Sequence, residues 1–216
     1  MKILLLDSGI GLIPFIKEII NQNKGNDYYF YMDHEFFPYG NKSKNFLKNR
    51  LKILLKKFEK LNIDLLLICC NTLSNIYLKH KYITPYKVKN IFSLNYKHLN
   101  NNSILVTPSL KKFYQKDHRF ISCSLASKIE NNDIYEIIQE IKSMKFNNKV
   151  ILGCTHYPLV KSIFKHYLEN EVLSYEDIFI NQLEGGKSIR FFARDYEKNI
   201  INKYFPNFII NHYDLS

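Results

Sequence analysis

Arginine is scarce in this strongly basic chain. Of the 31 basic residues only four are arginine: Arg50, Arg119, Arg190 and Arg194. The planar guanidinium group of arginine forms bidentate hydrogen bonds with phosphate and guanine, whereas lysine acts as a point charge. The lysines are also scattered along the sequence. The net charge of +11 therefore argues for a solvated basic surface that favours anionic substrates, and against nucleic acid as the main partner.

Long apolar runs and metal-type cysteine spacings are also missing. No stretch reaches the length of a membrane-spanning helix, and the short apolar run before Asp7 is too short for a signal peptide and has no cleavage site. The four cysteines, Cys69, Cys70, Cys123 and Cys154, form no C-x-x-C pair and no Cys/His cluster of the zinc type. We therefore expect a cytoplasmic protein with reduced thiols, no metal and no membrane partner.

Glycine-rich phosphate loops are absent too. The segment Asp7-Ser8-Gly9-Ile10-Gly11 matches only the first part of a dinucleotide fingerprint, because Pro14 stands where the third glycine belongs. With 216 residues, of which 46% are hydrophobic, the chain is long enough to bury the core of one ordinary domain or of two small ones.

Short apolar runs that end in polar turns recur along the chain. They predict buried parallel strands at Ile3–Leu6, Tyr28–Met32, Asp64–Ile68, Ser103–Val106 and Val150–Leu152. Helical spacing of apolar residues predicts helices between them, at residues 13–20, Lys44–Leu61 and Asp133–Met144. Ser8 is expected to cap the first helix. Ile178–Ile180 and Phe208–Ile210 are predicted as strands of a tail whose place in the sheet stays open.

The same order of strands and helices, a βαβ pattern, occurs twice along the chain. It predicts an α/β fold of two similar domains, each a parallel sheet flanked by helices. The polar stretch Lys97–Asn102 is the expected boundary. Ligands of open parallel sheets bind beyond the carboxyl ends of the strands. We therefore expect an active site in the cleft between the halves, with Cys70 and Cys154 on opposite sides.

Cys70 and Cys154 are the strongest candidates for catalysis. Each follows a predicted strand and precedes small polar residues and a helix start, where backbone N–H groups favour the reactive thiolate. Cys69 and Cys123 fit the role of small buried hydrophobic residues. One nucleophilic cysteine would suggest acyl transfer, whereas two thiols facing one ligand suggest stereoinversion. One thiolate would remove an α-proton and the opposite thiol would return another.

Other polar residues at the same strand ends complete the predicted site. Asp7 and His156 are expected to assist the thiols, although each could also have a structural role. The neutral donors and acceptors suit the charged groups of an amino acid, and comprise Ser8, Asn71, Thr72 and Thr155. Tyr39 and Gly40 lie in a loop that could close the cleft.

Four motifs together resemble glutamate racemases of the aspartate/glutamate racemase superfamily. They are Asp7-Ser8-Gly9-Ile10-Gly11, Pro38-Tyr39-Gly40 with Lys42-Ser43, Cys70-Asn71-Thr72, and Gly153-Cys154-Thr155-His156-Tyr157-Pro158-Leu159. The resemblance implies two α/β domains, formed by residues 1–96 with a returning tail 178–216, and by residues 97–177. It also implies racemisation without a cofactor or a metal, D-glutamate supply for peptidoglycan, and a homodimer.

The resemblance assigns roles to individual residues. It makes Cys70 and Cys154 the acid/base pair, Asp7 and His156 their assistants, and Glu130 a further catalytic assistant. Substrate binding is assigned to Asp7, Ser8, Tyr39, Gly40, Asn71, Thr72, Thr155 and His156. Two positions depart from the family pattern, because Leu12 replaces a glycine and Leu73 a small alanine.

Two other functions stay open at this point. One is racemisation of aspartate or of another amino acid on the same scaffold, although aspartate racemases usually have an acidic residue in place of His156. The other is a non-catalytic binding protein that uses its basic surface, against which the intact pair of cysteines argues.

Overall fold

Two parallel β-sheets organise the chain, which the computed structural model describes over residues 1–92, 101–112, 114–186 and 188–215. The larger sheet has the order β10-β9-β2-β1-β3-β4, and all its neighbouring strands are parallel. The strands are β1 (Lys2–Asp7), β2 (Asp27–Met32), β3 (Leu65–Ile68), β4 (Lys87–Asn90), β9 (Arg190–Ala193) and β10 (Ile210–His212).

The smaller sheet repeats the central part of the larger one. It consists of β5 (Ser103–Val106), β6 (Phe120–Ser122), β7 (Val150–Leu152) and β8 (Val172–Ser174). These strands are parallel and have the order β6-β5-β7-β8, which matches β2-β1-β3-β4 when β5 is equated with β1. The expected α/β fold of two similar sheets is confirmed, and the cysteines follow equivalent strands, β3 and β7.

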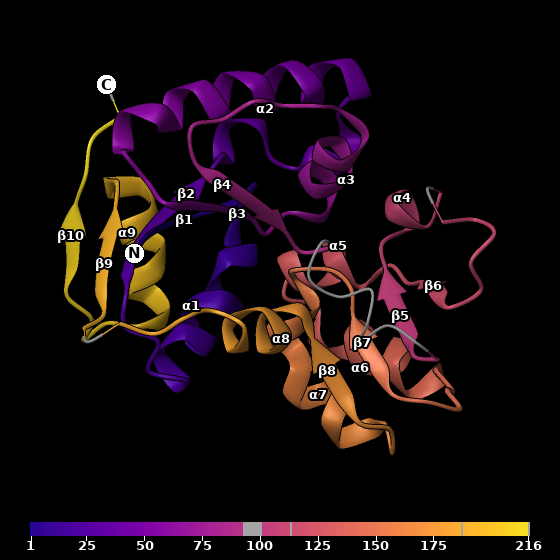
Figure 1. Cartoon of the computed structure of the whole chain (residues 1–216). Helices are drawn as coiled ribbons and strands as arrows, with labels where there is room; N and C mark the ends of the chain where they lie inside the picture. Colours follow the sequence, from indigo (N-terminus) through magenta and orange to yellow (C-terminus); the bar gives the residue numbers. More distant parts are fainter. Residues whose placement is uncertain (93–100, 113, 187, 216) are drawn as a thin grey trace.

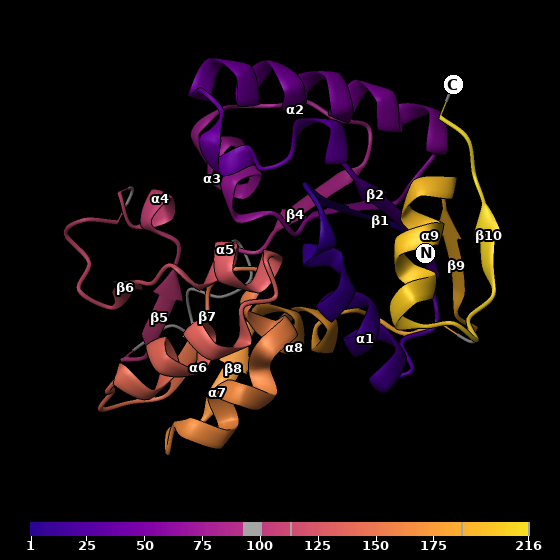
Figure 2. The ribbon, with the colours of Figure 1, turned by 180° about the vertical axis from the view of Figure 1, so that it is seen from behind.

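Helices cover both faces of the larger sheet (Figures 1 and 2). They are α1 (Ile13–Asn21), α2 (Lys44–Phe58), α3 (Asn71–Lys79) and α9 (Asp195–Tyr204). Alternate residues of β1 point to opposite faces, so Leu4 and Leu6 pack in the cluster that contains α2 and α3, whereas Ile3 and Leu5 pack toward α1. The two unusual leucines fill these clusters, Leu12 on the α1 face and Leu73 on the α3 face.

The smaller sheet has its own helices, which are α4 (Pro108–Lys111), α5 (Leu125–Glu130), α6 (Ile134–Ser143), α7 (Lys161–Tyr167) and α8 (Tyr175–Asn181). Helix α8 joins the halves because it packs against α1, where the rings of Phe15 and Phe179 meet edge to face with centroids 6.5 Å apart. One apolar cluster therefore contains residues of both sheets.

The structure corrects the prediction for the tail. Ile178–Ile180 lie in α8 and not in a strand, because Ser174 and Asp177 form a capping box that starts a helix there. The second predicted strand is displaced, from Phe208–Ile210 to β10 at Ile210–His212. Residues 97–100 of the expected boundary lie outside the described residues, and the domain limits stay a prediction.

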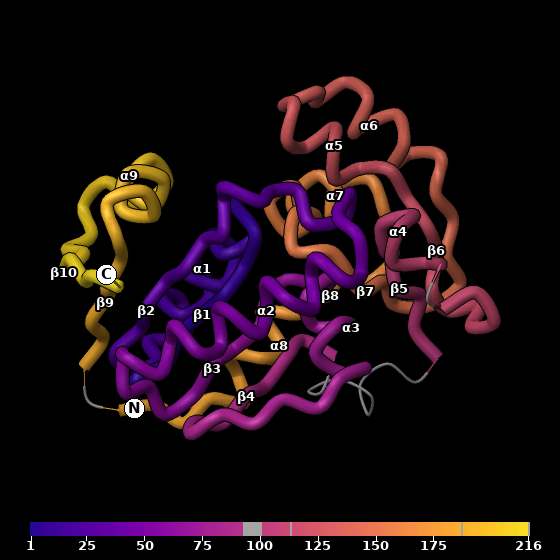
Figure 3. The backbone as a smooth tube through the Cα atoms, turned by 90° about the horizontal axis from the view of Figure 1, so that it is seen from above, coloured from indigo at the N-terminus to yellow at the C-terminus, as the bar shows by residue number. Residues whose placement is uncertain are grey.

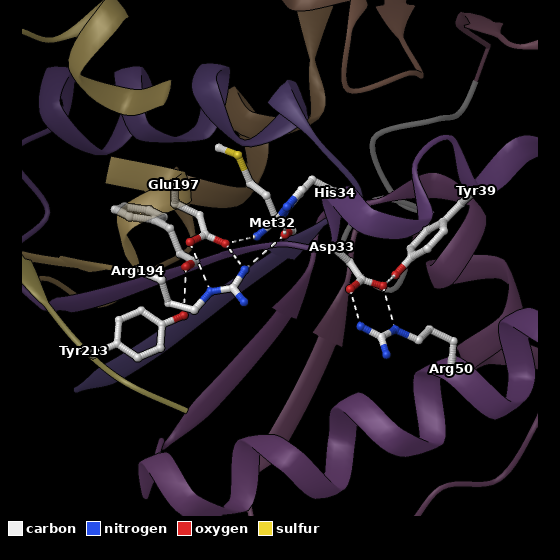
Figure 4. Close-up of polar contacts among 9 residues, drawn as sticks. Met32, Asp33, His34, Tyr39, Arg50, Arg194, Glu197 and Tyr213 are labelled. Carbon is white, nitrogen blue, oxygen red and sulfur yellow. Dashed lines mark hydrogen bonds and ion pairs between the residues drawn. The ribbon is translucent and has the colours of Figure 1, made fainter. Parts of the chain in front are cut away.

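The segment β9-α9-β10 extends the larger sheet beyond β2, at the end of the molecule opposite β5 and β6 (Figure 3). A buried ion pair fixes it there. Glu197 accepts a hydrogen bond from the Met32 amide at 2.9 Å, and Arg194 donates to the Met32 carbonyl at 3.2 Å and pairs with Glu197 (Figure 4). In the described residues no helix has the length and apolarity needed to cross a bilayer.

Candidate active site

A cavity of about 120 Å³ lies between the carboxyl ends of the two sheets. Its walls come from the segments that follow β1, β2 and β3 on one side, and β5, β6 and β7 on the other. The lining residues are Ser8, Phe37, Pro38, Tyr39, Gly40, Cys70, Asn71, Thr72, Thr107, Ser109, Glu130, Cys154, Thr155 and His156. All predicted site residues except Asp7 thus line one cavity. Ligand pockets for drug-sized molecules are several times larger, so this one suits a very small ligand.

Cys70 lies directly before α3, two residues after the end of β3, and its side chain is buried in the cavity wall. Its Sγ lies 3.9 Å from the hydroxyl oxygen of Ser8. Burial, followed by the negative charge of Asp7, raises the pKa of Cys70 to about 12, although the amides of Leu73 and Thr72 and the Ser8 hydroxyl lower it. The predicted N–H groups are present at the helix start, but they do not outweigh desolvation, so Cys70 rests as a thiol.

Cys154 has a different set of neighbours. Its Sγ lies 3.8 Å from Nδ1 of His156, and Nε2 of the same ring lies 3.1 Å from Oε1 of Glu130 at the end of α5. Burial lowers the pKa of His156, but the contacts with Cys154 and Glu130 and the charge of Asp7 outweigh it and raise this pKa to about 10. A protonated imidazole beside a sulfur atom stabilises a thiolate.

Asp7 ends β1 and lies behind the cavity wall, where only 1% of its surface is exposed. Its Oδ1 accepts a hydrogen bond from the Gly9 amide at 3.0 Å, whereas Oδ2 has no hydrogen-bond partner among the described residues. Burial raises the pKa of Asp7 to about 6, and the charge of His156 is the largest effect that lowers it. A buried carboxylate with one free oxygen is costly for stability, which favours a role in chemistry.

Close contacts join the two halves beside the cavity. The side-chain amide of Asn71 donates to the carbonyl of Gly153. A Cβ atom on Gly11 would lie 2.4 Å from Oγ1 of Thr155, so only glycine permits this approach. Ser8 caps no helix, because α1 starts five residues later and the 3-10 turn before it has no side-chain cap. The Ser8 hydroxyl instead faces Cys70.

Sequence reasoning missed four of the lining residues. Phe37 and Pro38 precede Tyr39 in the loop between β2 and α2, while Thr107 and Ser109 follow β5. Thr107 caps α4 through its hydroxyl. For Thr107 and Ser109 the available signal was the same one that identified Asp7 and Cys70, a polar turn at the end of a buried strand, whereas Phe37 and Pro38 lie five and six residues beyond β2 and carried no such signal. Among the described residues, no group of three or more His, Cys, Asp or Glu side chains could hold a metal ion.

The chain is similar to curated glutamate racemases over most of its length. It is 27% identical to the enzyme of Borreliella burgdorferi over 218 aligned positions, which cover 91% of this chain and 84% of the relative. It is 31% identical to the glutamate racemase of Aliivibrio fischeri over 196 positions, which cover 79% of this chain and 74% of the relative. A scan against protein-family models finds no match.

Solved structures of the same fold include a glutamate racemase isoform of Bacillus anthracis, with a TM-score of 0.75 and 20% identity over 98% of this chain and 96% of the other. The Escherichia coli glutamate racemase in complex with L-glutamate and an activator has a TM-score of 0.72 and 18% identity, covering 98% and 97%. A Picrophilus torridus aspartate racemase scores 0.59 at 15% identity, covering 82% and 90%. The structures show the shared fold, and the sequence relatives place this amino-acid racemase in the glutamate racemase family.

Proposed function

We propose that this protein interconverts L- and D-glutamate by a two-base proton transfer between Cys70 and Cys154, without a cofactor, and so supplies D-glutamate for peptidoglycan. One observation carries the proposal. Two cysteines that follow equivalent strands of two similar sheets line the same small cavity, and each has its own charged neighbour.

The chemistry needs one thiolate and one thiol at the start of each turnover. The thiolate takes the α-proton of the substrate, so that an S–H bond forms as the C–H bond breaks and its electron pair stays on the substrate as a carbanion. The opposite thiol then gives its proton to the other face of the same carbon and becomes the thiolate. The configuration is inverted, and the two sulfur atoms have exchanged protonation states.

The two cysteines have ionisable neighbours of opposite charge. Cys154 lies beside an imidazole that is positively charged near neutral pH. Cys70 lies near the carboxyl group of Asp7, which favours its protonated form. In the reverse direction Cys70 must start as the thiolate, and the Asp7 carboxylate can accept the Cys70 proton before the α-proton is removed, because a pKa of about 6 lies close to working pH.

The cavity suits a small zwitterion with an additional carboxylate. Its hydroxyl and amide donors come from both halves, with Ser8, Asn71 and Thr72 on one side, and Thr107, Ser109 and Thr155 on the other. Their O–H and N–H groups can donate to carboxylates, and their oxygen atoms can accept from an ammonium group. The family relationship favours glutamate as the substrate. The cytoplasmic location and the homodimer stay predictions.

Circular dichroism of the purified protein with L-glutamate, with no cofactor added, tests this function. We expect the optical signal to decay to zero with glutamate, and to persist with L-aspartate. Decay with aspartate alone would redirect the assignment to aspartate racemisation. A folded protein that racemises neither amino acid and binds DNA in a strongly salt-dependent way would contradict the proposal and favour a binding function.

A further inference from the structure

A buried ion pair lies directly behind the loop that forms one wall of the cavity. Asp33 follows the last residue of β2, and its carboxylate accepts hydrogen bonds from Nε of Arg50 at 2.8 Å and from Nη2 at 2.5 Å (Figure 4). The same carboxylate accepts a hydrogen bond from the phenol of Tyr39. Asp33 is buried, and Arg50 on α2 is half-buried. Bidentate Arg–carboxylate pairs of this kind fix geometry as well as charge.

The loop that carries Tyr39 lies outside the sheet, so inter-strand hydrogen bonds do not hold it in place. It connects β2 with α2 through two short 3-10 turns, His34–Phe36 and Tyr39–Asn41. Arg50 contacts the first of these turns at both ends, because its guanidinium binds Asp33 at the start of the turn and also lies over the ring of Phe36, 4.2 Å from the centroid. The helix therefore holds the loop from outside the cavity.

Tyr39 connects this ion pair to the site. Its ring is buried in the cluster under α2 and α3, and with Gly40 it lines the cavity opposite Thr107 and Ser109. Burial and the charge of Asp33 raise the pKa of Tyr39 far above its usual range, so the phenol stays protonated and remains a donor to Asp33. The backbone amide of Asp33 also donates to the Asp7 carbonyl at 2.9 Å, which fixes the start of the loop next to the end of β1.

We infer that Asp33 and Arg50 are positioning residues, which act through Tyr39 to set the wall that Tyr39 and Gly40 present to the substrate. This inference rests on the proposed racemase function. Arg50 neutralises Asp33 and orients its carboxylate, and Asp33 in turn fixes the phenol. Neither side chain lines the cavity, so their effect on substrate is indirect.

The same strand offers a matched control at its other end. Arg190 binds Asp27, the first residue of β2, with the same bidentate geometry, at 2.7 and 2.6 Å. The Arg190 side chain is 61% exposed, against 17% for Arg50, and Asp27 is five residues before the end of the strand that leads to the site. If ion pairing only stabilised β2, loss of either arginine would affect the reaction in the same way.

The test compares Arg50→Gln with Arg190→Gln, using kcat and KM for L-glutamate and urea unfolding of each variant. At a temperature at which both are folded, we expect kcat/KM of Arg50→Gln to fall about 10- to 100-fold, because small displacements of a binding wall have effects of this size. Arg190→Gln is expected to stay within about twofold of wild type. Added guanidinium, but not ammonium, is expected to restore part of the Arg50→Gln activity.

A second variant keeps the test decisive if Arg50→Gln does not fold. Tyr39→Phe retains the buried ring and removes only the hydroxyl that binds Asp33, and we expect a decrease in kcat/KM of the same order. Wild-type kcat and KM in folded Arg50→Gln, or in Tyr39→Phe, would overturn the positioning role, as would an equal loss in Arg190→Gln. An inactive wild type would instead refute the proposed function, so the two failures are distinguishable.

Discussion

Cys70 and Cys154 occupy equivalent positions in two similar sheets, but their surroundings differ in charge. Near Cys70 the principal ionisable neighbour is the carboxyl group of Asp7, and the pKa of this cysteine is raised to about 12. Near Cys154 it is an imidazole, whose own pKa is raised to about 10 through contacts with Cys154 and Glu130. A repeated fold can thus give two equivalent cysteines ionisable neighbours of opposite charge.

Replacing either cysteine tests whether both sides are needed, and has the largest expected effect. Cys70→Ser and Cys154→Ser should each reduce racemisation by about 10³-fold or more, because serine is too weak an acid to replace a thiol in proton transfer. Circular dichroism would measure both the rate and the retained fold. Cys123→Ser, which alters a buried thiol outside the cavity lining, is the control. Full activity of either site variant would contradict the two-base assignment.

Replacing Asp7 separates activity from stability on the Cys70 side. We expect Asp7→Asn to lower kcat about 10²-fold and to remove a decrease in kcat/KM that the wild type shows below about pH 6, the pKa of Asp7. The same change should stabilise the fold. The pKa of Asp7 is raised from 3.8 to about 6, so its ionised form destabilises the native state by about 3 kcal/mol.

The sign of this stability effect depends on pH. Below pH 4 Asp7 is protonated in both the folded and the unfolded states, and the substitution should have little effect on the free energy of unfolding. The gain should grow between pH 4 and pH 6 and stay constant above. Urea unfolding at several pH values would measure it, with Asp195→Asn, at an exposed carboxyl, as the control. A loss of stability at pH 8 would contradict the account.

Replacing Gly11 tests whether the segment after β1 must approach the segment after β7 closely. In Gly11→Ala the new methyl group would lie 2.4 Å from Oγ1 of Thr155 and 2.9 Å from Oδ1 of Asp7. We expect destabilisation of about 1–3 kcal/mol and a roughly tenfold decrease in kcat/KM. Gly185→Ala, where the nearest atom lies at 3.8 Å, should change neither. Equal effects of both substitutions would show that the close contact is unimportant.

Replacing Glu130 is expected to have the smallest effect on the reaction rate, because it alters only the surroundings of Cys154. Glu130→Gln removes a negative partner of His156 and should lower the pKa of that ring from about 10. The alkaline limb of the kcat/KM profile should therefore move to lower pH, while the rate near pH 7.5 should fall less than about tenfold. An acid limb that moves instead would assign Glu130 to the other cysteine.

The sequence was sufficient to predict the site residues that lie at the ends of buried strands. Each of Asp7, Cys70 and Cys154 lies at the end of a buried strand or within two residues of it, and parallel pairing brings such positions to one edge. Short strands such as β6 and β8, with three residues each, are too short to show a period. The run Ile178–Ile180 was misassigned because three apolar residues suit a strand and a helix equally, and a capping box decided between them.

The state of the site could not be predicted from residue types alone. The thiol form of Cys70 depends on burial and on the proximity of Asp7, which are tertiary properties. The contact of Glu130 with His156, at 3.1 Å, and the support of Tyr39 by Asp33 and Arg50 likewise depend on tertiary packing and join residues that share no motif.

The distribution of deuterium in the first part of a reaction tests the two-base mechanism most directly. L-Glutamate would be incubated with the wild-type protein in deuterated buffer, and the two enantiomers separated and analysed for α-deuterium at low conversion. Two facing cysteines predict deuterium at the α-carbon of the D-glutamate formed and almost none in the recovered L-glutamate, because solvent-derived deuterium is delivered only by the opposite thiol. Early deuterium in both enantiomers alike would contradict this and indicate a single base that serves both faces.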